Sequence, residues 1–136
     1  MPTKNQLLSN SRKLRRTFVK RKLLEGNPQK KGICIRISVM APNKPNSAKR
    51  KVVRAQILST NKRAWVYIPG EGGHTLQIYS NILIRGGRVQ DLPVQYKAVR
   101  NKYDLGPVEK RMSSRSKYGR KQEVNKWKKI KLKTRY

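Results

Sequence analysis

Few side chains in this sequence could carry covalent chemistry. His74 is the only histidine, and Glu71 is the carboxylate nearest to it along the chain. An acid/base mechanism would also need a second carboxylate or an activated nucleophile close by, and the sequence offers neither. The glycine-rich stretch 69–73 is followed by His-Thr, whereas the last glycine of a phosphate-binding P-loop is followed by Lys-Ser/Thr. We therefore interpret it as a turn and His74 as a residue that caps this turn or contacts a binding partner, and we predict no enzymatic activity.

The sequence also predicts no metal site or cofactor of its own. Cys34 is the only cysteine, so an internal disulfide or a Cys-x-x-Cys site cannot form. One histidine and one cysteine cannot supply the usual four ligands of zinc. Cys34 falls on the polar phase of an alternating segment, and we expect it to be a small, half-buried residue that points outward.

Basic side chains are the groups that most clearly require a partner. Lys and Arg number 35 against 6 Asp and Glu, which gives a net charge of +29 over 136 residues. A polyanion is the simplest explanation, and nucleic acid is a better candidate than an anionic membrane or an acidic protein. No apolar run approaches the ~20 residues of a membrane span, so we expect no membrane association.

The basic residues are concentrated at the two ends of the chain. Residues 1–31 carry ten Lys and Arg and one acid, and residues 110–136 carry twelve and one. The longer middle segment, 32–109, carries thirteen and four. Dense like charge with few apolar residues is typical of arms that become ordered only against a partner.

The middle of the chain has the alternating pattern of short β-strands. We expect a short helix near residues 5–9 and strands near residues 33–39, 53–57, 65–68, 82–84 and 96–99. Five strands in about seventy residues predict an all-β fold, a five-stranded OB-fold barrel. We assign residues 1–31 to a basic N-terminal extension, 32–104 to the barrel and 105–136 to a basic C-terminal tail.

Two loops between these strands would carry the binding residues. An OB-fold holds oligonucleotides with its first and fourth inter-strand loops, which here are residues 41–49 and 86–93. Two prolines restrict the backbone of the first loop, so its polar atoms are held in place before binding. The basic run that follows, Lys49, Arg50 and Lys51, is expected to contact phosphates rather than form a solvated surface.

Two other functions are compatible with a basic OB barrel. A free single-strand binder or RNA chaperone would use exposed aromatic residues as stacking platforms. Trp65 and Tyr67 share one face of the third expected strand, but we favour packing in the barrel or beneath the N-terminal arm. A basic nuclease would need a carboxylate cluster or a histidine pair, which six scattered acids and one histidine do not provide.

Several ordered motifs resemble one known family. The sequence Pro-Asn-Lys-Pro-Asn-Ser-Ala-Lys-Arg-Lys at residues 42–51 closely resembles the signature loop of the small-subunit ribosomal protein twelve family. Motifs similar to those of this family follow its order along residues 4–121. They lie at residues 5–7, 28–32, 67–72, 76–77, 85–93 and 115–119.

The resemblance implies an OB barrel in the small ribosomal subunit, with an N-terminal arm that threads through rRNA. The implied partners are small-subunit rRNA, the codon–anticodon region of mRNA and tRNA, and neighbouring ribosomal proteins. It implies no homo-oligomer, and any structural Mg²⁺ would be held by the rRNA. Residues implied to line the decoding centre, and so to support tRNA selection and accuracy, are Lys44, Pro45, Asn46, Ser47, Lys49, Arg50, Lys51, Arg85, Arg88, Gln90, Asp91, Leu92 and Pro93. Residues implied to form an rRNA-binding tail are Arg115, Ser116, Lys117 and Tyr118.

The chain departs from the family at several positions. Asn43 and Gln90 stand where the family usually has lysines, in the region where the resemblance implies that streptomycin binds. Tyr79 replaces a usual histidine, Gly73 is an additional residue, and no glycine follows Pro93. Residues 122–136 extend beyond the usual end.

These departures and the abundance of Lys, Asn, Ile and Tyr are typical of an AT-rich organellar genome. We expect a mitochondrial ribosome, with bacterial cytoplasm or a plastid as alternatives. Because the family-like start lies at residues 4–7, we also expect no transit peptide before it and synthesis inside the organelle.

Overall fold

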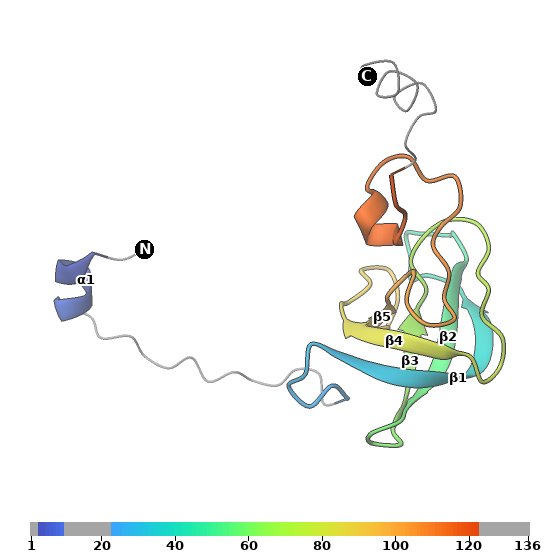
Figure 1. The fold of residues 1–136 in the computed structure, drawn as a ribbon, viewed down its shortest axis with the longest axis horizontal. Helices are drawn as coiled ribbons and strands as arrows, with labels where there is room; N and C mark the ends of the chain where they lie inside the picture. The colour runs from blue at the N-terminus through green and yellow to red at the C-terminus, as the bar shows by residue number, and fades with distance from the viewer. Residues whose placement is uncertain (1–2, 10–22, 123–136) are drawn as a thin grey trace, which may run out of the picture.

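Five strands close into a barrel in the computed structural model, which describes residues 3–9 and 23–122 (Figure 1). The strands run in the spatial order β1-β2-β3-β5-β4, and all neighbours pair antiparallel except β3 and β5. Their bounds are β1 (Gln29–Met40), β2 (Arg50–Ile57), β3 (Arg63–Tyr67), β4 (Asn81–Gly86) and β5 (Tyr96–Ala98). This architecture confirms the prediction of an all-β, five-stranded OB-fold barrel.

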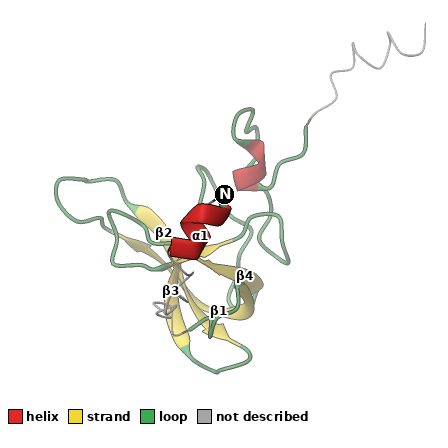
Figure 2. Ribbon diagram, turned by 90° about the vertical axis from the view of Figure 1, so that its left-hand side faces the viewer, coloured by secondary structure: helices red, strands yellow, loops and turns green. Residues whose placement is uncertain are grey.

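Among the described residues, two short helical segments lie outside the barrel strands (Figure 2). Helix α1 (Lys4–Ser9) has no buried side chain, and Thr3 precedes it. The hydroxyl of Thr3 accepts the backbone N–H of Gln6, whose side-chain oxygen accepts the N–H of Thr3. These reciprocal bonds form a capping box and explain where the helix begins. The second segment is a 3-10 turn, η1 (Arg115–Tyr118), which ends at Gly119 in a left-handed conformation.

The long strand β1 pairs with two neighbours and changes its inward face along its length. Its first part pairs with β4 and the rest with β2, and the β2 pairing shifts register between Cys34 and Arg36. Gly32 and Cys34 point inward before this bulge, while Ile37 packs on the core after it. One extra residue in a strand reverses the side on which the following side chains lie.

The prediction that Cys34 points outward and is half-buried was therefore wrong. Cys34 is fully buried, whereas Ile33 and Ile35 are only half-buried and Val39 is 56% exposed. A Cβ at Gly32 would lie 2.8 Å from the Ile84 side chain and 2.9 Å from the backbone of β2, so only glycine fits inward there. Alternation alone could not identify the inward face, because both faces of β1 carry apolar residues.

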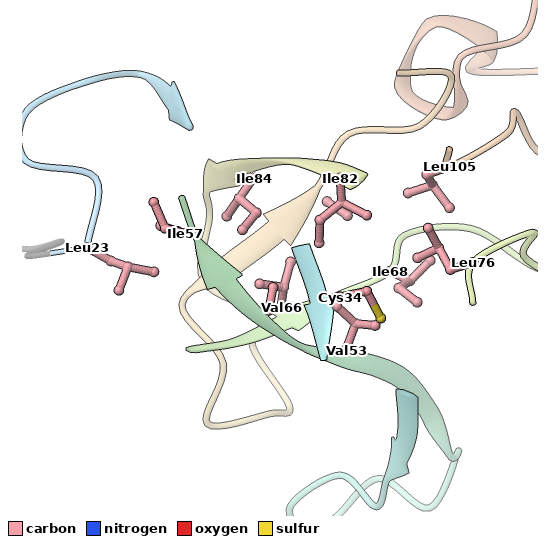
Figure 3. Close-up of a cluster of buried hydrophobic side chains, with 12 residues drawn as sticks. Leu23, Cys34, Val53, Ile57, Val66, Ile68, Leu76, Ile82, Ile84 and Leu105 are labelled. Carbon is pink, nitrogen blue, oxygen red and sulfur yellow. The ribbon is translucent and has the colours of Figure 1, made fainter. Parts of the chain in front are cut away.

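The core fills the barrel with aliphatic side chains from all five strands (Figure 3). It also includes residues outside the strands, because Leu23 joins it before β1, and Leu76 and Leu105 join it from the loops. Val108 is buried as well, at 6% exposure. Buried side chains thus lie on both sides of the segment 32–104, and the expected segment boundaries stay a prediction. No helix in the described ranges is both long and apolar enough to cross a membrane.

Candidate RNA interface

A second apolar cluster lies outside the barrel core and supports the loop between β4 and β5. Neighbouring residues of a strand face opposite sides, and both Val52 and Val53 are fully buried. Val53 belongs to the core, and Val52 packs in the second cluster. The other members of this cluster are Val89, Leu92 and Val94, with Met40, Trp65 and Tyr67 packed against them. The loop is therefore built on its own hydrophobic base.

The aromatic residues of β3 belong to this base. Trp65 and Tyr67 are half-buried and contact the second cluster. Both rings therefore pack, as preferred, but outside the barrel core and against residues of the loop at 87–95, and the preference against base stacking stays a prediction. The guanidinium of Arg54 also lies 6.0 Å from the ring centre of Trp65.

The two loops expected to bind RNA are joined to each other. The backbone N–H of Asn43 donates to the carbonyl of Asp91 at 2.8 Å. The Arg50 guanidinium donates twice to one carboxylate oxygen of Asp91, through Nε at 2.9 Å and Nη2 at 2.7 Å. The Asp91 side chain is 9% exposed and that of Arg50 is 38% exposed. The hydrogen bonds and charge of Asp91 raise the pKa of Arg50, which favours the charged form of its guanidinium.

These contacts divide the expected interface residues into supporting and exposed groups. Asp91 holds Arg50, Leu92 is buried in the second cluster, and the Lys51 ammonium donates to the carbonyl of Gly72. The members that remain exposed on the two loops are Asn43, Lys44, Pro45, Asn46, Ser47, Lys49, Arg88, Gln90 and Pro93. Arg85 is exposed at the end of β4. The loops therefore present basic and amide side chains to solvent, while the supporting contacts hold the loop backbone in place.

The C-terminal turn packs beside the 69–73 turn rather than extending freely. The N–H of Val108 donates to the carbonyl of Tyr118 at 3.1 Å. The guanidinium of Arg111 lies 4.6 Å from the ring centre of Tyr118 and 3.2 Å from a carboxylate oxygen of Glu71. Of the expected tail residues, Ser116 and Lys117 are exposed, while Arg115 and Tyr118 are half-buried.

Arg100 organises this region, and the sequence reasoning missed it. It is 5% exposed and donates to the carbonyls of Pro69 at 2.7 Å and Gly106 at 3.3 Å, with longer bonds to Gly73. Burial lowers the pKa of its guanidinium, and no salt bridge neutralises it within residues 23–122. Its partners are backbone atoms up to 31 residues away, so no local sequence signal could have identified it.

His74 lies at a pocket of about 280 Å³ between the 71–75 segment and residues 106–109. Its Nδ1 atom is buried and has no hydrogen-bond partner within the described part of the chain. Burial lowers its pKa, and the positive charges of Lys51 and Arg100 lower it further. The nearby carboxylate of Glu71 is 87% exposed and pairs with Arg111 instead. Among the residues described, no group of three or more His, Cys, Asp and Glu could hold a metal ion.

The comparison with known families agrees with this arrangement. The sequence model of the family described as "Ribosomal protein S12/S23" matches residues 17–126, which is most of the chain. This match includes the whole barrel, both basic loops and the C-terminal turn. The chain therefore belongs to the ribosomal protein S12/S23 family, whose members are structural rather than enzymatic proteins of the small ribosomal subunit that bind rRNA and other ribosomal proteins.

Proposed function

We propose that this protein lines the decoding centre of the small subunit and supports tRNA selection and translational accuracy. The observation that carries the proposal is the connection between the two loops through Asp91, which accepts bonds from both Asn43 and Arg50. Residues 41–49 and 87–95 thereby form one surface rather than two independent loops. A surface that responds to the shape of a codon–anticodon pair needs this rigidity.

The exposed residues of this surface have distinct roles in the proposal. Lys44, Lys49 and Arg88 neutralise rRNA phosphates, which positions the barrel without reading sequence. Pro45, Asn46 and Ser47 approach the codon–anticodon minihelix together with Gln90 and Pro93. The second apolar cluster beneath the loops reduces the conformational freedom that is lost on binding.

Other basic residues attach the protein to rRNA away from the decoding surface. We assign the tail residues Arg115, Ser116, Lys117 and Tyr118 to this role, whereas Arg85, at the end of β4, belongs with the residues that contact rRNA at the decoding surface. The contacts of Tyr118 with Val108 and Arg111 fix the turn before RNA is bound. Structural Mg²⁺ in this region would be held by the rRNA.

Asn43 and Gln90 provide the test of the decoding role. Both are exposed amides on the joined loops, where lysine would offer a charged donor to phosphate. An amide can also donate to a phosphate, but unlike an ammonium group it adds no charge–charge attraction. The amides therefore hold the loops less firmly against RNA than lysines would. In the presence of streptomycin, we expect ribosomes with the unchanged chain to misread less than ribosomes in which lysines replace these amides.

The experiment compares ribosomes that carry Asn43→Lys, Gln90→Lys, both substitutions, or the unchanged chain. We expect each lysine to increase drug-induced misreading and the double variant to increase it most. A control is Ser59→Lys, which adds the same charge at an exposed position in the turn after β2, outside both loops. Unchanged misreading in all three variants would contradict the assigned role of these loops.

For localisation, we propose the mitochondrial ribosome. The support is compositional: Lys, Asn, Ile and Tyr are abundant, and Tyr79 and Gln90 depart from the usual family residues. Fractionation of organelles followed by sedimentation tests the proposal. The protein should travel with the mitochondrial small subunit at moderate salt, and its recovery with plastid or bacterial subunits would contradict it.

A further inference from the structure

The outer face of β1 and β4 carries apolar side chains that the barrel does not use. Gly32 and Cys34 point into the barrel, so Ile33 and Ile35 face outward. On β4, Ile82 and Ile84 are fully buried, so the half-buried Leu83 faces outward as well. The two strands lie side by side (Figure 1), with Ile33 paired to Asn81 and Lys31 to Leu83.

Two loop segments extend this apolar face. The N–H of Tyr79 donates to the carbonyl of Cys34 at 2.7 Å, which places the 77–80 turn beside β1. Asp104 exchanges bonds with Asn81, at 3.2 Å and 2.6 Å, and so brings Tyr103 to β4. We call this surface the β1–β4 patch, and it consists of Ile33, Ile35, Ile78, Tyr79, Leu83 and Tyr103.

Three members of the patch are too exposed to contribute much to the stability of the fold. Tyr79 is 78% exposed, Ile78 is 58% exposed and Tyr103 is 49% exposed. Adjacent exposed apolar residues on a soluble surface mark an interaction site more often than isolated ones do. Tyr79 also has a φ of +68°, a conformation that a tyrosine adopts only at a cost, and the ring gains no burial in return.

The rim of the patch is basic. The ammonium of Lys31 lies 5.1 Å from the ring centre of Tyr103, and that of Lys102 lies 6.0 Å from it. Arg36 is exposed on β1 just beyond the bulge. A partner that fits this surface has apolar side chains at its centre and negative charge at its edge.

A protein segment fits these features better than RNA does. Ile33, Ile35, Ile78 and Leu83 are aliphatic, and a base has little to gain from them beyond burial because it stacks best on aromatic or guanidinium planes. The Tyr103 ring is already approached by two ammonium groups, which leave it less accessible to a stacked base.

We propose that the β1–β4 patch is the docking surface for a segment of another small-subunit protein, in which apolar side chains are flanked by Asp or Glu. The apolar side chains cover Ile78, Tyr79 and the outward residues of the strands, and the acids pair with Lys31, Lys102 and Arg36. This proposal rests on membership of the small subunit and is independent of the role of the two loops in decoding.

A photo-crosslink from within the assembled subunit tests the proposal directly. Ile78 is replaced by p-benzoylphenylalanine in the full chain, and purified small subunits that contain it are irradiated. We expect one protein adduct whose crosslinked peptide contains apolar residues beside acids. An adduct with rRNA, an adduct with a peptide lacking acids, or no adduct would each overturn the proposal.

A variant pair separates docking from folding. Tyr79→Asp introduces a residue type that tolerates the positive φ at this position, and it adds a charge that repels an acidic partner. We expect the adduct yield to fall at least about tenfold, while incorporation of the chain into subunits stays unchanged. The matched control is Met112→Asp, at a residue 77% exposed and outside the patch, which should leave the yield unchanged. Equal yields in both variants would overturn the proposal, whatever the outcome of the decoding experiments.

Discussion

Removing the Arg50–Asp91 ion pair should weaken the connection between the two loops at a measurable cost in stability. Asp91→Asn keeps the size of the side chain, so the packing of Leu92 and the bond from Asn43 to the Asp91 carbonyl remain. Arg50→Met keeps most of the apolar stem and removes the donors. The two single variants and the double variant form a double-mutant cycle that isolates the interaction between the two side chains.

The magnitude follows from the exposure and geometry of the pair. Exposed ion pairs contribute about 0.2–1 kcal/mol, whereas removing one partner of a fully buried pair costs about 3–5 kcal/mol. Here the carboxylate is 9% exposed and accepts two bonds, but the Arg50 side chain is 38% exposed. We therefore expect a coupling energy of about 1–2 kcal/mol, which lies between these limits.

Urea unfolding of the full chain gives the free energies of unfolding for the cycle. Arg111 and Glu71 provide an internal comparison, because they form a single bond of 3.2 Å and Glu71 is 87% exposed. Their cycle should give less than about 0.5 kcal/mol and should weaken further in high salt. Equal coupling energies for the two pairs would refute the claim that Asp91 joins the loops.

Three further predictions concern the turn at 69–73, the only histidine and the only cysteine. Gly70→Ala should destabilise the fold by about 1–3 kcal/mol in thermal unfolding, because φ is +105° and the added Cβ would meet Val108; Gly72→Ala, with open space around it, should cost less. The single imidazole signal of His74 should titrate by NMR below the ordinary value of about 6.5, and Lys51→Met should raise its pKa. Because the folded protein then binds this proton less readily than the unfolded chain, stability should fall as pH decreases from about 6.5 through the lowered pKa. Burial raises the pKa of Cys34 and excludes reagents, so its thiol should react with Ellman's reagent only as fast as the barrel opens.

The strands and turns could be predicted because their signals are local. Alternation located all five strands, and Asn61 takes the positive φ expected of a turn residue between β2 and β3. The positions of the two basic loops followed from the OB topology once five strands were recognised. The family itself was identified from short ordered motifs, which the match over residues 17–126 confirms.

The features that were missed depend on contacts between distant residues. The bulge after Cys34 reverses the inward face of β1, and apolar residues on both faces hide this change in the sequence. Arg50 and Asp91 are 41 positions apart, and their pairing depends on how the loops close over the second cluster. The hydrogen bonds of Arg100 to residues 69–106 all go to backbone carbonyls, which every residue type supplies.

The two loops are expected to act as one surface at the decoding site. Ser47→Cys and Gln90→Cys place a thiol on each exposed loop, and the buried Cys34 stays unmodified when an iron chelate is attached. Ser59→Cys, exposed in the turn after β2, serves as the control. Hydroxyl radicals are then generated in assembled small subunits that hold mRNA and a cognate A-site tRNA. We predict that both loop positions cleave overlapping rRNA nucleotides and also the A-site codon or the anticodon, while Ser59→Cys cleaves neither the codon nor the anticodon. Cleavage of separate rRNA regions from the two loops, or no cleavage of mRNA and tRNA from either, would contradict the account.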